Sequence, residues 1–268
     1  VSGSAYTYAY ASLGEFIAFV VGWDLILEYT VAASAVASGW SGYFTGLLKS
    51  GGIDLPVSLT KVPMDGGIIN LPAVIITVLL SVFLLRGTKE SAMLNRILVV
   101  IKLAVIALFL FLAAPHVQAA NWTPFMPFGF GGVAAGASIV FFAYIGFDAV
   151  ATSAEEAKNP DRDLPIGILG SLGVCAVLYF FVALVLTGIV PYSDLNTPEP
   201  VAYALRVIGY PIGSAIVAVG AICGITTVLL VLLYGQARIF FALSRDGMIP
   251  AGICKIHKLY RTPYLVTI

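Results

Sequence analysis

The chain has 268 residues, of which 60% are hydrophobic and 10% are charged, and its formal net charge is zero. Ordinary soluble domains carry about 25% charged residues, so the composition excludes a soluble globular protein and indicates an integral membrane protein. The neutral balance gives no reason to expect nucleic acid as a partner. The three cysteines and two histidines lack metal-ligand spacing, so we expect no metal site, no cofactor and no disulfide framework.

Six apolar segments are long enough to cross a bilayer core, which takes about 20 residues of helix. None shows the two-residue alternation of a barrel strand, so the sequence predicts an all-α membrane protein. The first and sixth segments are too long for an upright helix and must tilt or extend beyond the membrane. In chain order, the predicted spans are 13–44, 68–85, 94–114, 131–153, 165–190 and 211–243.

Lysine and arginine indicate the orientation of these spans. Outside the predicted spans, three of these basic residues fall on one side of the membrane, namely Lys49, Lys61 and Arg206. The other ten fall on the side that holds both chain ends. Because these residues collect on the cytoplasmic side, we expect a multi-pass protein of the plasma membrane with both ends of this segment cytoplasmic. The chain begins without a methionine or a signal peptide, which we interpret as a piece of a longer protein.

Proline and glycine predict where several helices begin and end. Asn159 and Pro160 should end the fourth span, and Pro165 has the position of a first helical residue in the fifth. The stretch RDGMIP (245–250) should close the sixth span in the same way.

A lysine interrupts the third span, which reads VVIKLAVIALFLFLAA over residues 99–114. The apolar residues outweigh the cost of about 3 kcal/mol for a central lysine. Lys102 lies about 9 Å along a helix from Arg96, so its side chain could reach back to the cytoplasmic interface. The other interpretation, which we favour, is that the ammonium faces the interior of the helix bundle.

The fourth span contains a predicted helix break. In the stretch FFAYIGFDA (141–149), Gly146 weakens the helix and Asp148 places a charge in the middle of the membrane. Broken helices occur in membranes only where the exposed backbone lines a cavity or is buried in protein. We therefore favour a break that lines a substrate site over a packing face in which Asp148 bonds to a neighbour.

Two acids in the first span, Asp24 and Glu28, are four residues apart and share one face of a helix. Acids are costly against lipid, so this face is expected to point inward or toward water. A structural pairing and a role in ligand binding both remain open.

Four motifs follow one another along the chain: GSAYTYAYASLGEFIAFVVGWDLILEY (3–29), RGTKESAMLNRILVVIKLAVI (86–106), FFAYIGFDAVATSAEEAKNPDRDLPIGI (141–168) and YGQARIFFALSRDGMIP (234–250). Together they resemble the cationic amino acid transporter family of the amino acid–polyamine–organocation (APC) superfamily. The resemblance implies an inverted-repeat (5+5) transporter fold with one discontinuous helix near residues 142–148. It implies a single transmembrane domain over 1–268 that holds the third to eighth helices, without the first two and those after the start of the ninth.

The resemblance also implies a substrate site. Backbone carbonyls of the break would hold the substrate amino group and Phe142 would cap it, within the set Phe142, Ala143, Tyr144, Ile145 and Gly146. Leu232 matches a position that lines the pocket for the substrate side chain, and Glu28 is the nearest candidate acid. Lys102 matches a lysine whose ammonium stands where sodium-driven relatives hold a sodium ion, and we expect Lys102 and Asp148 to take part in proton coupling.

We therefore expect a proton-coupled amino acid permease that works by alternating access and carries out no covalent chemistry. The apolar side chains of Leu232, Phe142 and Ile145 favour a small neutral amino acid such as alanine. The alternatives are an amino acid exchanger, a cationic amino acid transporter and a non-transporting receptor. A membrane enzyme is disfavoured, because the spans hold no Ser/His, His/Glu or paired-His arrangement. The expected partners are the amino acid, protons and the lipid bilayer, and the sequence does not indicate a protein partner.

Overall fold

The computed structural model describes residues 4–85, 91–146 and 159–250, and every regular element in these ranges is a helix. This confirms the all-α prediction. The longer helices are α1 (Ser4–Leu13), α2 (Glu15–Ser50), α3 (Leu71–Leu85), α4 (Ser91–Ala113), α5 (Gly129–Val140), α7 (Pro160–Ile189), α8 (Pro200–Val207) and α9 (Pro211–Arg245). Short 3₁₀ helices join them: η1 (Val57–Leu59), η2 (Pro63–Asp65), η3 (Ala114–His116), η4 (Ala119–Trp122), η5 (Phe141–Tyr144) and η7 (Tyr192–Asp194).

All six predicted spans correspond to helices. Within the described residues, four helices are long and apolar enough to cross a membrane, namely Glu15–Ser50, Arg96–His116, Arg162–Ile189 and Pro211–Arg245. The other two are the shorter apolar helices Leu71–Leu85 and Gly129–Tyr144. With 36 and 35 residues, α2 and α9 are each more than about 50 Å long. They exceed a bilayer core of about 30 Å, as their sequence lengths predict.

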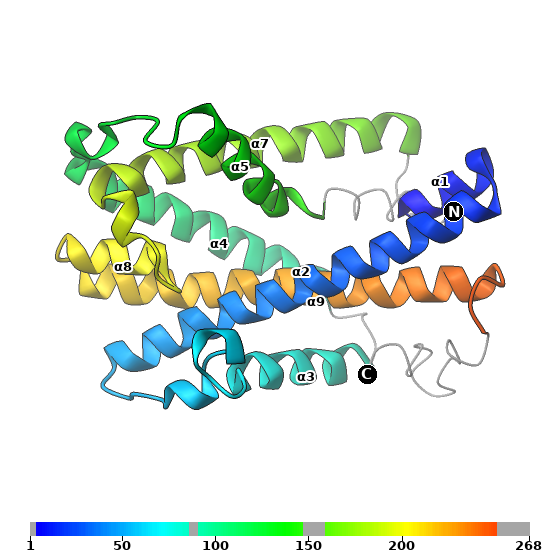
Figure 1. The fold of residues 1–268 in the computed structure, drawn as a ribbon, viewed down its shortest axis with the longest axis horizontal. Coiled ribbons are helices and arrows are strands. Elements are labelled where there is room, and N and C mark those ends of the chain that lie inside the picture. Colours follow the sequence, from blue (N-terminus) through cyan, green and yellow to red (C-terminus); the bar gives the residue numbers. More distant parts are fainter. Residues whose placement is uncertain (1–3, 86–90, 147–158, 251–268) are drawn as a thin grey trace.

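Helices α2 and α9 form the centre of the fold and cross each other in Figure 1. Two hydrogen bonds between side chains join them, from Trp40 Nε1 to Thr226 Oγ1 (2.9 Å) and from Gln236 Nε2 to Thr30 Oγ1 (2.7 Å). The later residue of α9 pairs with the earlier residue of α2, so the helices are antiparallel. Polar bonds of this kind satisfy groups that lipid cannot.

Most of the other helices, α5 excepted, belong to two buried apolar clusters that share α9. One buried apolar cluster joins α1, α2, α3 and α9, and a second joins α4, α7, α8 and α9. Because α9 belongs to both clusters, it is the helix around which the fold is organised.

Helix α1 was not expected from the sequence, because its apolar stretch is too short to predict a span. Its Tyr6 is fully buried in the first cluster. Burial, together with the nearby carboxylate of Asp246, raises the pKa of Tyr6 to about 12, so the hydroxyl remains neutral. The contact ties α1 to the end of α9.

The prediction that Pro165 begins a helix was wrong. Helix α7 begins at Pro160, and Pro165 lies inside it. The backbone N–H of Asn159 donates to Asp163 Oδ2 (3.2 Å), and the Asn159 carbonyl accepts from Asp163 N (2.8 Å). These bonds satisfy backbone groups at the helix start, much as a capping box does. At the other end of the chain, α9 ends at Arg245 as expected and Gly247 follows with φ +79°.

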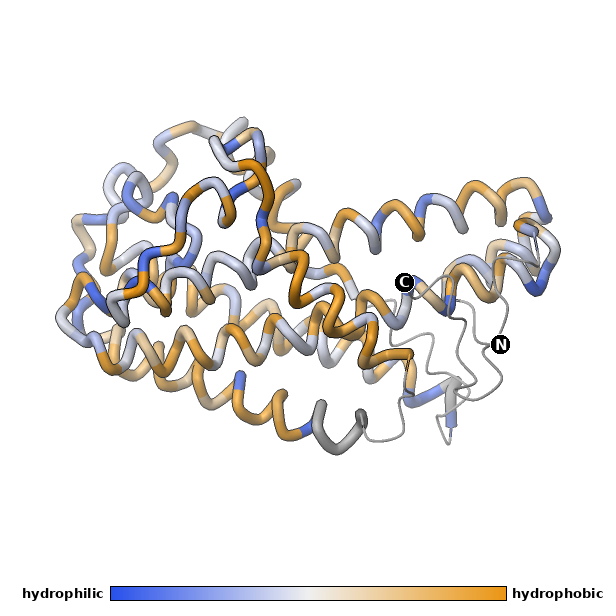
Figure 2. Tube along the Cα trace, turned by 90° about the horizontal axis from the view of Figure 1, so that it is seen from below, coloured by the Kyte–Doolittle hydropathy of each residue, from blue (hydrophilic) through white to orange (hydrophobic). Residues whose placement is uncertain are grey.

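Apolar side chains remain exposed along the outer helices. Figure 2 shows hydrophobic residues along the helices and hydrophilic ones concentrated in the connections at their ends. Several large apolar side chains are three-quarters exposed or more, namely Phe16, Phe111, Phe130 and Ile139. So large an apolar surface needs lipid or further protein to cover it, as expected of a multi-pass membrane protein.

Candidate functional site

The first half of the predicted discontinuous helix ends where the sequence predicts, whereas the second half, from residue 147 on, lies outside the described residues. Helix α5 ends at Val140 and tightens into the 3₁₀ turn η5, which ends at Tyr144. Ile145 then has extended geometry (φ −56°, ψ 135°), and Gly146 has φ +108°, a conformation that strongly favours glycine. The backbone therefore leaves the helix at the residues that the sequence singled out.

A cavity of about 620 Å³ lies between the break and α9. Helices α2, α4, α7, α8 and α9 and the turn η5 all contribute to its wall. Among the described residues that line it, Lys102 alone is charged, and Tyr43 and Tyr179 alone add polar side chains. The lining is Tyr43, Lys102, Val105, Ile106, Phe109, Ala143, Tyr179, Val182, Val201, Val217, Gly220, Ala221, Gly224, Ile225 and Val228.

Glycines on α9 bring Lys102 into this cavity. A Cβ added to Gly224 would lie 3.4 Å from Lys102 Cβ and 3.7 Å from its Cδ. One turn away, a Cβ on Gly220 would overlap the side chain of Val105. Small residues of this kind let membrane helices approach closely. Within the described residues no carboxylate lies within ion-pair distance of Lys102, and most of the residues that line the cavity with it are apolar.

Tyr179 of α7 contacts the break, and the sequence did not predict this role for it. Its hydroxyl on α7 donates a hydrogen bond of 2.9 Å to the Ala143 carbonyl. Its ring meets that of Tyr144 edge to face, with 5.3 Å between the centroids. In the sequence, Tyr179 is marked only as a polar side chain within the apolar stretch GVCAVLYFFVAL (173–184). That position does not reveal which residue its hydroxyl contacts.

The residues of the break face different surroundings. Ala143 lines the cavity, whereas Ile145 packs against the cluster between α2 and α9. Leu232 belongs to that cluster and is 4% exposed, so it does not line the cavity that holds Lys102. Phe142 is 38% exposed. The break thus lies between the lysine-lined cavity and the α2–α9 core.

The predicted acids lie apart from this cavity or outside the described residues. Glu28 is half-buried on α2 and Asp24 is exposed, and neither lines the cavity. Asp148 lies outside the described residues, so its role in proton coupling stays a prediction. In the described parts of the chain, no group of three or more His, Cys, Asp or Glu residues could hold a metal ion.

Comparison with known proteins identifies the family. A family model described as amino acid permease matches residues 1–268. The chain belongs to the amino acid permease family. This confirms the resemblance drawn from the four motifs, and it favours a transporter over a membrane enzyme.

Several curated relatives cover almost the whole chain. A methylthioribose transporter of Bacillus subtilis (strain 168) is 50% identical over 98% of it, and the branched-chain amino acid permease BcaP of the same organism is 50% identical over 100%. The human cationic amino acid transporter 4 is 38% identical over 100% of the chain. The chain spans 58% of the length of each Bacillus relative and 43% of the human one.

Replacing Tyr179 with phenylalanine tests its hold on the break. The change removes the hydrogen bond to the Ala143 carbonyl, a loss of about 1 kcal/mol, and we expect the apparent affinity of the full-length protein for its substrate to fall about fivefold. Uptake measured over a range of substrate concentrations would show this as a raised KM. Tyr192→Phe, in the exposed turn η7, should leave KM unchanged. Equal KM values for both variants would contradict the role of Tyr179.

Proposed function

We propose that the full-length protein is a secondary active permease for neutral, apolar L-amino acids, driven by protons and working by alternating access. The observation that carries the proposal is the placement of Lys102 in an apolar cavity beside the broken helix. Lys102 is half-buried, and its amine is the group in this lining that could carry a proton. A proton taken up and released at this position could be coupled to movement of the substrate.

The charge of the cavity favours a neutral substrate. An arginine or lysine side chain would need a carboxylate there, but among the described lining residues the one charge is that of Lys102, which would repel a cation. Glu199 lies near one end of the cavity, yet its carboxylate pairs with Arg206. A neutral apolar side chain would instead be surrounded by valine, isoleucine and alanine.

The names of two relatives support this choice in part. BcaP of Bacillus subtilis is named for branched-chain amino acids, which are neutral and apolar. The methylthioribose transporter, at the same 50% identity, favours a second candidate, an uncharged thioether sugar. Both substrates lack the cationic side chain that the human relative's name implies.

Uptake by the full-length protein in proteoliposomes tests the proposal. The assay would compare radiolabelled alanine, leucine, arginine and methylthioribose under an inward proton gradient, an inward sodium gradient and no gradient. We expect alanine or leucine to accumulate with the proton gradient alone. Arginine uptake at least as fast as alanine uptake would overturn the neutral substrate, and preferred uptake of methylthioribose would establish the second candidate.

The same vesicles separate a permease from an exchanger. If internal unlabelled amino acid is required before labelled substrate enters, the protein is an exchanger and the proton-driven mechanism is wrong. We further propose a plasma-membrane location with the ends of this segment cytoplasmic, which places Lys49, Lys61 and Arg206 outside. Cysteines introduced near these residues should react with an impermeant reagent added to intact cells.

A further inference from the structure

The connection between α7 and α9 inserts a carboxylate into the surface of α2. Glu199 precedes α8 and is only 8% exposed. A Cβ added to Gly46 would overlap its carboxylate, and a Cβ added to Gly42 would lie 2.8 Å from Pro198 Cβ. Gly42 and Gly46 are one helical turn apart and therefore form one groove on α2. Pro198 and Glu199 fill that groove.

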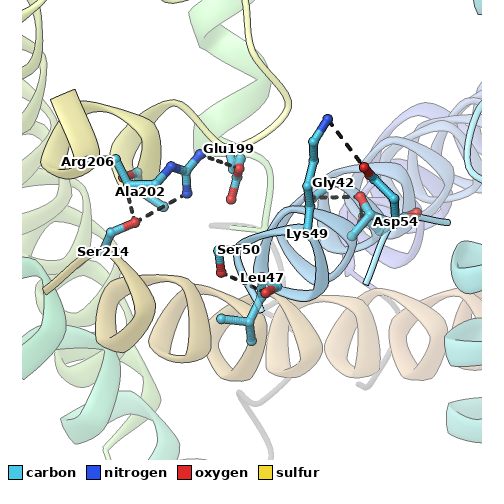
Figure 3. Close-up of polar contacts among 11 residues, drawn as sticks. Gly42, Leu47, Lys49, Ser50, Asp54, Glu199, Ala202, Arg206 and Ser214 are labelled. Carbon is cyan, nitrogen blue, oxygen red and sulfur yellow. Dashed lines mark hydrogen bonds and ion pairs between the residues drawn. The ribbon is translucent and has the colours of Figure 1, made fainter. Parts of the chain in front are cut away.

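An ion pair fixes Glu199 in place, as Figure 3 shows. Arg206 Nη2 donates to Glu199 Oε1 at 2.5 Å, and Arg206 Nη1 donates to Ser214 Oγ at 3.3 Å. Ser214 in turn donates to the Ala202 carbonyl at 2.7 Å. The network therefore joins the beginning of α8, its last turn and the beginning of α9. The other ion pair at this end of the molecule, between Lys49 and Asp54, is about three-quarters exposed on both side chains.

Stability alone does not account for this arrangement. The second carboxylate oxygen of Glu199 is buried and has no hydrogen-bond partner among the described residues. Burying a half-satisfied carboxylate costs free energy, and a buried ion pair often stabilises a fold less than apolar packing would. What the pair does fix is the position of the residues that follow it.

Those residues form one end of the cavity. Val201, two residues after Glu199, lines the cavity together with Tyr43 of α2. The Tyr43 hydroxyl faces the backbone of Val201 and the Glu199 carboxylate. Ala202, Ala204 and Leu205 are fully buried behind this wall. A displacement of Glu199 from its groove would therefore move the wall.

We propose that Glu199 and Arg206 are positioning residues that anchor α8 in the Gly42–Gly46 groove of α2 and thereby close this end of the cavity to water. The anchor controls how readily polar molecules enter the cavity past Val201. It acts on access rather than by contact with the transported molecule. The anchor depends on the proposed function only in experiments that measure transport.

Cysteine labelling tests the anchor without relying on transport. Val201→Cys is introduced into the full-length protein with every native cysteine, Cys175, Cys223 and Cys254 included, replaced by serine, and its reaction with a water-soluble maleimide is timed. Adding Glu199→Gln, which keeps the shape but removes the charge pair, should raise the labelling rate about tenfold. Lys49→Gln, which breaks the exposed pair with Asp54, is the matched control and should leave the rate unchanged. Equal rates with and without Glu199→Gln would overturn the anchor.

A pair of glycine variants distinguishes the anchor from general loosening of the protein. Gly46→Ala should expel the Glu199 carboxylate and raise the labelling rate, whereas Gly39→Ala, whose Cβ would meet nothing within 4 Å, should not. If Gly46 and Glu199 act through one contact, adding Gly46→Ala to Glu199→Ala has no further effect. Additive effects would overturn the assignment. If labelling behaves as expected but no amino acid is transported by the parent protein, the anchor stands and the proposed function fails.

Discussion

Replacing Lys102 with alanine is expected to abolish proton-driven uptake by the full-length protein while leaving substrate binding measurable. The side chain lines an apolar cavity and packs against Gly224 of α9. Among the described lining residues it carries the one charge, and under the proposed mechanism its removal should lower proton-driven uptake at least about a hundredfold. Uptake in proteoliposomes under a proton gradient and equilibrium binding of labelled substrate measure the two effects separately.

The arginine variant of Lys102 separates proton coupling from simple positive charge. A guanidinium keeps its charge at any working pH and is larger than an ammonium, so Lys102→Arg should also lose proton-driven uptake. Lys61→Ala, in the exposed connection between η1 and η2, should transport like the parent protein. A fully active arginine variant, or uptake that depends on sodium, would instead assign Lys102 to the cytoplasmic interface.

The spans could be predicted because their signal is local. An apolar run of about 20 residues forms a helix in lipid whatever surrounds it, and all six predicted runs correspond to helices. The break could be predicted for the same reason: Gly146 weakens the helix by its own conformational freedom, and the structure gives it φ +108°. The lysine in the third span was conspicuous because the residues around it are apolar.

Contacts between distant segments could not be predicted in this way. Tyr179 reaches the carbonyl of Ala143 across 36 residues, and no periodicity within α7 reveals that pairing. Glu199 lies between two prolines, as in an ordinary loop, and only the groove on α2 buries it. The helix start was predicted wrongly at Pro165 because, from sequence alone, a proline in the early turns of a helix resembles one at its first position. In each case tertiary structure decided what the local sequence left open.

Gly220 is expected to be the glycine least tolerant of substitution between α4 and α9. A Cβ at this position would lie 2.8 Å from Val105 Cγ1 and 2.9 Å from its Cβ, closer than packed atoms allow, and another Val105 methyl would overlap it. The helices would have to separate, so Gly220→Ala should destabilise the full-length protein by about 1–3 kcal/mol. Thermal unfolding in detergent would show this as a lowered Tm.

Neighbouring glycines provide the comparison that makes this result specific to the helix contact. Gly224→Ala should cost less, because its Cβ would stop 3.4 Å from Lys102, and Gly173→Ala on α7, whose Cβ would meet nothing within 4 Å, should be neutral or stabilising. Adding Val105→Ala to Gly220→Ala removes the overlapping methyls and should recover part of the lost Tm. If Gly220→Ala and Gly173→Ala unfold at the same temperature, α4 and α9 do not meet at these glycines. The placement of Lys102 in the cavity would then lose its structural basis, because the same helix contact holds both.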